Sequence, residues 1–157
     1  MKKKAFTLVE LLIAVILVGL SIASLVAANI SFTKANGVGA NSSTAEFLVE
    51  QIRELTTLLP LTDPLTDDTF GPEEPNLAGY DDLDDFDGAT FSPPINADRE
   101  ILSDLSAFSQ QVTVENVSAS DFDQVVGDLE TDFVRVTVEV FFNSGQIRSA
   151  AWLRARH

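Results

Sequence analysis

The first 33 residues of the chain separate into a short basic start and a long apolar run. Three lysines at residues 2–4 precede the run, and no charged residue occurs between Leu11 and Thr33. About 20 consecutive apolar residues are enough to cross a bilayer as a helix. We therefore expect a transmembrane helix over residues 6–33. The lysines before it predict a cytoplasmic N-terminus and an extracytoplasmic C-terminal part.

An ordinary secretory signal peptide is the alternative interpretation of this start. The apolar core of such a signal normally has about 7–15 residues and closes with a small-x-small cleavage site. Here the apolar run is longer, and the nearest approach to a cleavage site is the stretch from Ala23 to Ala27. The length favours a permanent single-pass anchor over a removed signal.

A second apolar pattern follows at helical spacing and predicts an amphipathic helix over residues 34–60. Its apolar residues recur at intervals of three and four, as on one face of a helix. They are Ala45, Leu48, Ile52, Leu55 and Leu59. Pro60 and Pro64 end the pattern. Asn and Gly residues cluster at 36–41, and because they are weak helix formers we expect a flexible or bent joint there.

Residues 61–109 combine negative charge with turn-forming residues, and Arg99 is the only basic residue between 63 and 104. Prolines and glycines interrupt any regular element. Even so, apolar anchors recur that a disordered acidic segment would lack. They are Phe70, Leu77, Tyr80, Leu83, Phe86 and Phe91. The sequence predicts an ordered, irregular acidic loop region pinned by these side chains.

Residues 110–157 alternate between apolar and polar side chains, as strands of an antiparallel sheet do. A short alternation at 112–115 is followed by a strong one over 133–142. The apolar side chains of the longer strand share one face: Val134, Val136, Val138, Val140 and Phe142. We expect a three-residue hairpin loop at 143–145, with Gly145 taking the positive φ. The return strand over 146–154 is expected to place Ile147, Ala151 and Leu153 on the apolar face.

These elements predict an α+β fold. A sheet with one apolar face needs a covering element, and the stripe of the 34–60 helix is the candidate of sufficient size. The expected architecture is a long N-terminal helix, with a membrane half and an amphipathic half, packed on a small three- to four-stranded antiparallel sheet.

Composition excludes several kinds of catalytic site. The chain has no Cys, and its only His is His157 at the very end. Ser-His-Asp, Cys-His and multi-His zinc sites are therefore ruled out, and we do not expect an enzyme. The formal charge of −14 argues against a nucleic-acid partner. A DNA-binding role would need a basic surface, for which Arg148, Arg154 and Arg156 are the candidates, although they are also simply solvated strand and tail positions.

Glu10 is a carboxylate inside an otherwise apolar helix. Such a charge costs a few kcal/mol unless it lies near the membrane interface or is paired, and one interpretation is that Glu10 only reaches the lipid headgroups. The surrounding sequence, from Lys2 through Phe6-Thr7-Leu8-Val9-Glu10 to Gly19, suggests another. It resembles the class III signal of type IV pilins and type II secretion pseudopilins, over about the first 30 residues.

The resemblance implies a processing site and an assembly site. A prepilin peptidase would cut between Ala5 and Phe6, remove residues 1–5 as a leader peptide and methylate the new amine of Phe6. Glu10 would then pair with that amine, in the same subunit or a neighbouring one, while Thr7 would contribute to packing between helices. The implied partners are the peptidase, other pilin or pseudopilin subunits and, before assembly into a filament, the inner membrane.

Some positions depart from the family pattern. The family usually has Gly where this chain has Ala5. Many major pilins have a Pro about twenty residues into the mature helix and a C-terminal disulfide, and both are absent here. These differences favour a minor pilin or a pseudopilin. The run from Gly79 to Gly88, followed by Ser92-Pro93-Pro94, resembles a segment of minor pilins of the mannose-sensitive haemagglutinin type.

The acidic loop region contains a candidate metal site. Its carboxylates could bind Ca²⁺, which takes about six to eight oxygen ligands. They are Asp81, Asp82, Asp84, Asp85 and Asp87. The EF-hand spacing is not met, and a solvated acidic turn is the competing interpretation. If the loop is ordered, its like charges must be offset by a cation, by backbone N–H groups or by Arg99.

Two classes of function remain open from the sequence. The first is a structural subunit of a type IV pilus-like or type II secretion filament. The second is a signal-anchored extracytoplasmic binding domain that never polymerises. The second would have no use for Phe6, Thr7 and Glu10 at their particular spacing.

Overall fold

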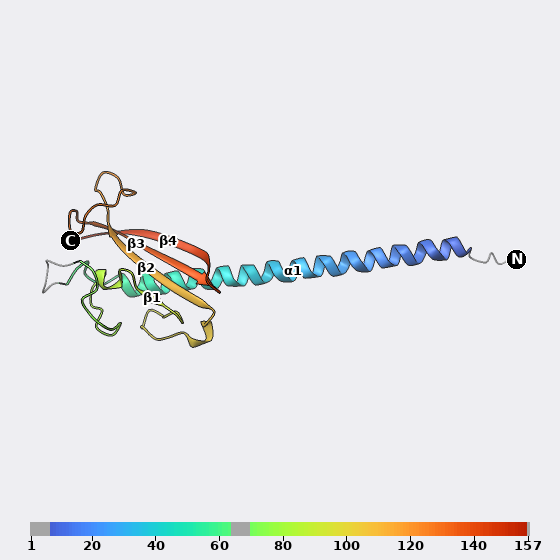
Figure 1. Cartoon of the computed structure of the whole chain (residues 1–157), viewed down its shortest axis with the longest axis horizontal. Helices are drawn as coiled ribbons and strands as arrows, with labels where there is room; N and C mark the ends of the chain where they lie inside the picture. The colour runs from blue at the N-terminus through green and yellow to red at the C-terminus, as the bar shows by residue number, and fades with distance from the viewer. Residues whose placement is uncertain (1–6, 64–69, 157) are drawn as a thin grey trace. The chain divides into compact units, whose positions relative to one another are not determined.

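The computed structural model describes residues 7–63 and 70–156. Its regular elements, labelled in Figure 1, are the helix α1 (Leu8–Thr56) and the strands β1 (Thr90–Phe91), β2 (Phe108–Asn116), β3 (Phe133–Phe142) and β4 (Gly145–Ala155). Two single turns of 3₁₀ helix, η1 (Asp84–Phe86) and η2 (Ser103–Leu105), lie in the connections. The chain divides into two compact units, one ending at Ala40 and one beginning at Asn41.

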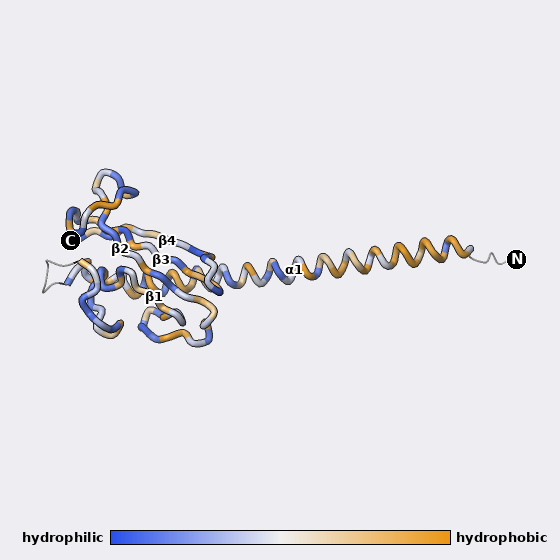
Figure 2. The backbone as a smooth tube through the Cα atoms, in the orientation of Figure 1, coloured by the Kyte–Doolittle hydropathy of each residue, from blue (hydrophilic) through white to orange (hydrophobic). Residues whose placement is uncertain are grey.

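In the first unit, the described residues are helical from Leu8 onward. Every described side chain up to Ala40 is exposed, and the apolar ones fill the first part of α1, which Figure 2 colours orange. The helix is long and apolar enough to cross a membrane. Because no described residue of this unit covers these side chains, lipid or other apolar helices must do so. Single-pass anchoring is therefore consistent with the structure.

The expected joint at residues 36–41 is not seen as a break in the helix. The backbone is helical through Gly37 and Gly39, and α1 is continuous. A glycine costs only about 1 kcal/mol in a helix, which a long hydrogen-bonded helix tolerates. The weak helix formers therefore lower local stability here without ending the element.

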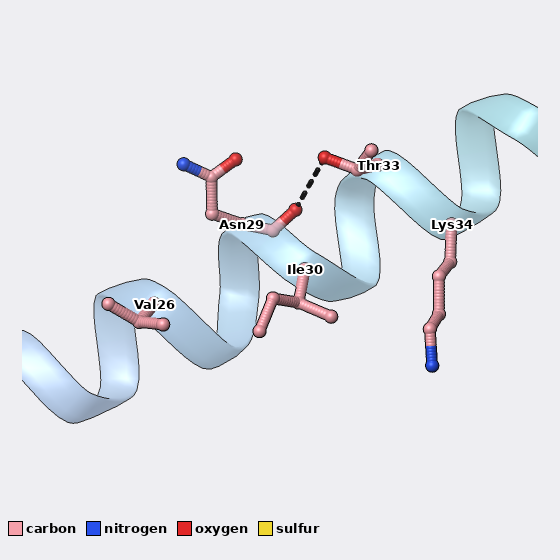
Figure 3. A pocket seen from close by; sticks show the side chains of 5 residues that line it. All are labelled: Val26, Asn29, Ile30, Thr33 and Lys34. Atoms are coloured by element: carbon pink, nitrogen blue, oxygen red, sulfur yellow. Dashed lines mark hydrogen bonds between the residues drawn. The ribbon is translucent and has the colours of Figure 1, made fainter.

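At the end of the apolar run, a charged residue follows the apolar ones on one side of α1. Figure 3 shows Val26, Ile30 and Lys34 on one side of the helix, while Asn29 and Thr33 lie on the other. The Thr33 hydroxyl donates to the Asn29 carbonyl at 3.0 Å, so it satisfies itself within the helix. A shallow hollow between these side chains belongs to the surface of a single helix. Lys34 is the first charge after the run, as expected where a membrane helix enters the headgroup layer.

In the second unit, α1 presents the predicted apolar stripe to a common core. Ala45, Leu48 and Ile52 are fully buried, and Leu55 and Leu59 pack against them. The helix ends at Thr56, slightly before the prolines that we expected to end it. Arg154 donates to the carbonyls of Thr56 (2.7 Å) and Leu59 (2.9 Å), so a cation from β4 satisfies the helix C-terminus.

The sheet is antiparallel with strand order β1-β2-β3-β4. The predicted alternation of β3 is confirmed, because Val134, Val136, Val138 and Val140 are buried. For β2, the sequence pattern predicted only residues 112–115 and so gave too short a strand. It also missed β1, a two-residue strand inside the region expected to be irregular. The fold is the expected one: a long N-terminal helix packed on a four-stranded antiparallel sheet.

The hairpin between β3 and β4 differs from the three-residue loop that we predicted. Phe142 pairs with Gly145, so the loop contains only Asn143 and Ser144, with φ angles of 48° and 67°. Positive φ at both central residues gives a turn whose twist matches that of the flanking strands, and Asn tolerates this conformation. The glycine therefore belongs to the strand rather than to the turn.

The face assigned to β4 was also wrong. Ile147, Ala151 and Leu153 lie on the exposed face, whereas Ala150 and Trp152 pack against the core. The pairing with β3 shifts register between Val140 and Phe141. Such an irregularity changes which residues face inward, and period-two counting from Ile147 cannot detect it.

Candidate functional site

The N-terminal site begins at a helix cap. Thr7 immediately precedes α1, and its backbone N–H and hydroxyl both donate to Oε2 of Glu10, at 3.0 and 3.1 Å. In return the Glu10 N–H donates to the Thr7 hydroxyl oxygen at 3.2 Å. This reciprocal arrangement is a capping box, which satisfies N–H groups that the first turn of a helix leaves without partners. The carboxylate also lies at the positive end of the helix dipole.

The capping box adds a local role that sequence analysis missed for both residues. We assigned Glu10 and Thr7 to assembly, but the Thr-x-x-Glu spacing just before an apolar run is itself a signal for this motif. The box uses atoms from Thr7 onward, so it does not depend on residues 1–5. The predicted cleavage and methylation site, Ala5 and Phe6, lies outside the described residues.

The second candidate site is in the acidic loop region, which the core holds in place. Leu83 and Phe86 are fully buried, and the predicted anchors Phe70, Leu77, Tyr80 and Phe91 pack around the same core. Tyr80 meets Phe86 edge-on, with ring centroids 5.0 Å apart. The Leu83 N–H donates to the Pro60 carbonyl at 3.0 Å, which ties the loop to the end of α1. In the described part of this region, residues 61–63 and 70–109, the apolar anchors pack on the core as predicted.

Burying these anchors also buries the carboxylates between them. Asp82, Asp84 and Asp85 are each 0% exposed. Each uses one carboxylate oxygen to hold the loop backbone. Asp82 Oδ1 accepts from the Asp85 N–H (3.1 Å), Asp84 Oδ2 from the Gly71 N–H (2.9 Å) and Asp85 Oδ2 from the Asp81 N–H (2.9 Å). Gly71 has a φ of 114°, a conformation open mainly to glycine.

The other oxygen of each of these carboxylates is buried without a hydrogen-bond partner in the described part of the chain. The same is true of Oε2 of Glu74, so the unpartnered atoms are Asp82 Oδ2, Asp84 Oδ1, Asp85 Oδ1 and Glu74 Oε2. A buried polar atom left in this way is costly, and several in one loop are uncommon in a native fold. These oxygens could therefore be satisfied by a bound cation or by protons.

Carboxylates of the loop form two groups that share Asp85, and Asp84 belongs to neither. One oxygen from each of Asp81, Asp82 and Asp85 lies within 4.8 Å of the others, and the same holds for Glu73, Glu74 and Asp85. Glu74 can fold inward because residue 79 is glycine, where a Cβ would lie only 2.9 Å from Glu74 Cγ. Sequence analysis missed both glutamates because they are separated along the chain from the Asp81–Asp87 run.

Three carboxyl groups of the loop, those of Glu74, Asp82 and Asp84, have raised pKa values. Burial, and next the neighbouring Asp84 carboxyl, raise the pKa of Asp82 to about 8. Burial also raises the pKa of Asp84. The adjacent Asp85 carboxyl, together with burial, raises the pKa of Glu74 to about 7. The surroundings of these three groups therefore favour their protonated, uncharged forms.

Arg99 does not neutralise this charge by direct pairing. Its guanidinium donates to the backbone carbonyls of Leu77 (2.9 Å) and Tyr80 (2.6 Å), so it holds the loop from outside the carboxylates. Asp87, a member of the expected metal set, accepts instead from the Val114 N–H at 2.8 Å and ties the loop to β2. The structure thus brings together Asp81, Asp82, Asp84 and Asp85 and directs Asp87 elsewhere.

Comparison with protein families bears on the N-terminal site. Residues 1–26 match the model of the prokaryotic N-terminal methylation motif. The chain carries a prepilin-type N-terminal segment. Comparisons with curated proteins and with solved structures found no match. The prepilin-type motif implies processing by a prepilin peptidase, and pilin-family proteins are generally structural rather than enzymatic.

Proposed function

We propose that the protein is a structural subunit, a minor pilin or pseudopilin, of a type IV pilus-like or type II secretion filament. The match of residues 1–26 to the methylation motif carries this proposal. The prepilin-type segment leads directly into an exposed apolar helix that needs a membrane or other helices around it. The acidic run that resembles minor pilins of the mannose-sensitive haemagglutinin type adds support for a minor subunit.

In this proposal, the lysines stay in the cytoplasm and the unit beginning at Asn41 lies outside it. Prepilin peptidase cuts before Phe6 and the new amine is methylated. The amine is positive and lies near a helix N-terminus, where the dipole disfavours it. Glu10 supplies the carboxylate that offsets this charge when the helix moves from the membrane into a filament among other pilin subunits.

The capping box makes a sharp test of this role possible. Glu10→Gln removes the negative charge but keeps an oxygen that can accept from Thr7, because Gln also serves in capping boxes. Thr7→Ala removes the reciprocal cap and keeps the charge. If pairing with the amine drives assembly, the Glu10→Gln protein should stay in the membrane. The Thr7→Ala protein should still enter filaments, with a reduced yield at most from the packing contact that the resemblance assigns to Thr7.

The measurement is the share of each variant in sheared filaments and in complexes purified with partner pilins, compared with the share left in the inner membrane. Equal membrane levels of the two variants serve as the control for insertion, which loss of a charge should not impair. Normal assembly of Glu10→Gln with failure of Thr7→Ala would assign Glu10 to helix capping alone. Absence of the wild-type chain from any filament would favour the non-polymerising anchored domain.

A further inference from the structure

The loop of residues 71–87 contains buried carboxylates that the proposed filament role does not use. Three of them, Asp82, Asp84 and Asp85, are fully buried, and each has one oxygen fixed by a backbone N–H and one without a partner. A carboxylate that served only to cap this turn would not need to bury its second oxygen. The arrangement resembles that of ligand carboxylates, whose orientation is set by hydrogen bonds behind them.

We propose that this loop binds a divalent cation of the calcium class at Asp85, with Asp81 and Asp82 as ligands on one side and Glu73 and Glu74 on the other. Ca²⁺ binds oxygens at about 2.3–2.6 Å, so oxygens on opposite sides of the ion are separated by roughly twice that distance. Within each of the two groups that share Asp85, the oxygens lie within 4.8 Å of one another, close enough for the members of a group to contact one ion.

The donor set selects among metals. Every candidate ligand is a carboxylate oxygen, which suits hard cations, whereas sites with soft thiolate or imidazole ligands suit zinc and copper. The ligands come from an irregular loop and from residues of different exposure, since Asp81 and Glu73 are exposed and Asp85 is buried. Ca²⁺ accepts irregular geometry with six to eight oxygens, while Mg²⁺ demands a near-ideal octahedron. The exposed carboxylates leave a path for the ion to enter.

The cation would complete the fold of the loop. Without it, several carboxylates are buried close together, and their repulsion and desolvation oppose the same packing that Leu83 and Phe86 favour. Binding to the folded state alone stabilises that state in proportion to the logarithm of the ion concentration. The alternative offset is a set of shared protons, which would make the loop sensitive to pH but not to calcium.

Terbium luminescence of the full chain in detergent micelles gives a direct readout. Tb³⁺ occupies calcium sites, and Tyr80, the only tyrosine of the chain, immediately precedes the site and sensitises a nearby ion. We expect saturable luminescence that excess Ca²⁺ displaces and equal Mg²⁺ displaces poorly. Tyr80→Phe keeps the ring that packs on Phe86 and should lower the signal several-fold without changing calcium binding measured by calorimetry.

Asp85→Asn tests the shared ligand, and Asp104→Asn is the matched control because it removes the same charge at an exposed position in η2. In wild type and in Asp104→Asn, millimolar Ca²⁺ should raise the Tm of the unit that begins at Asn41, called the outer unit below, by several degrees. Asp85→Asn should lose that shift and the calorimetric binding, yet melt no lower than wild type without calcium, because one buried charge has gone.

An unchanged wild-type Tm across a calcium titration, together with no displaceable terbium signal, would overturn the proposal and leave the carboxylates to shared protons. An equal calcium response in Asp85→Asn and wild type would place any ion elsewhere and also contradict it. These measurements do not depend on filament assembly, so a negative result would contradict the calcium site and leave the proposed function unaffected.

Discussion

Two regions of the chain place carboxylates where a negative charge is costly, and they deal with it differently. Glu10 stands at the start of an apolar helix, and its charge is met within one helical turn by Thr7 and the helix dipole. Asp82, Asp84 and Asp85 are buried by tertiary packing, and each keeps an oxygen that the described part of the chain does not satisfy. The first arrangement is locally complete, whereas the second leaves oxygens that protons or a bound cation could satisfy.

The difference shows how a charge can reveal function. At Glu10 the spacing alone explains the carboxylate, so an additional assembly role must be tested against the capping role. In the acidic loop region, hydrogen bonds from backbone N–H groups account for one oxygen of each fully buried aspartate and leave the second oxygen unexplained. Unsatisfied burial therefore points to an external ligand more strongly than charge density does, because a solvated acidic turn would have left these side chains exposed.

Removing a side chain that anchors the loop in the core should have the largest effect on stability. Phe86 is fully buried and contacts Tyr80 and Phe91 by ring packing. Phe86→Ala should destabilise the outer unit by about 3–5 kcal/mol, the usual range for removing a buried ring. Chemical denaturation followed by Trp152 fluorescence measures this effect. A loss below about 1 kcal/mol would mean that the loop, and the burial of its carboxylates, is not anchored through Phe86.

A change of pH should have the second-largest effect, because it changes the stability of the acidic loop region through its buried carboxyl groups. The folded-state pKa of Asp82 is about 8, against an ordinary value of 3.8, so the folded state binds more protons between these values. Without added calcium, stability should therefore be highest below about pH 4 as far as this group is concerned, and should fall as pH rises towards 8. Glu74 acts in the same direction up to about pH 7.

The measurement is the Tm of the outer unit between pH 5 and pH 8 with chelator and with Ca²⁺. We expect the fall in Tm to shrink when calcium is present, because the cation replaces the protons. Asp104→Asn is again the control. A Tm that rises steadily through this range in chelator would contradict the raised pKa values of the buried carboxyls.

Removing the guanidinium group of Arg99 should have a moderate effect on the stability of the outer unit. Arg99→Met takes away two charge-assisted hydrogen bonds to the Leu77 and Tyr80 carbonyls, at a cost of roughly 2 kcal/mol. Because Arg99 holds the backbone and not the carboxylates, we expect the calcium-induced rise in Tm to persist. Loss of the calcium response in an otherwise folded Arg99→Met protein would show that Arg99 belongs to the site.

Removing the cap should have the smallest effect. Thr7→Ala is expected to weaken the start of α1 by about 1 kcal/mol. That corresponds to roughly fivefold faster hydrogen exchange at the first amides of the helix in detergent-solubilised protein. Glu10→Gln should change the exchange less, since its amide oxygen can still accept from Thr7. Equal exchange in all three proteins would indicate that the capping box contributes nothing.

Much of the fold could be predicted because its signals are local and periodic. The stripe from Ala45 to Leu59 and the alternation of Val134–Val140 gave the helix, the sheet and the face on which they meet. The inward face of β4 could not be predicted, because the register irregularity near Val140 is a property of strand pairing and leaves no mark on the period of Ile147–Leu153.

The candidate sites divide in the same way. The prepilin-type segment was readable because its residues are consecutive, and the capping box at Thr7 and Glu10 follows from their spacing. In the acidic loop region, charge density indicated the right segment but the wrong set of carboxylates. Glu74 belongs to the set because Gly79 leaves space for its side chain, and Asp87 does not, because it accepts a hydrogen bond from the Val114 N–H. Both contacts are between segments that only folding brings together.

The most direct test of the account is the N-terminus of the mature protein, determined by intact mass and fragmentation of the chain purified from its native membrane. A prepilin-type subunit should begin at Phe6 with one added methyl group, having lost residues 1–5 with their three lysines. The apolar helix from Leu8 onward should be retained. A mature protein that begins near Ala28, or one that keeps Met1 in cells with active prepilin peptidase, would contradict the proposed function.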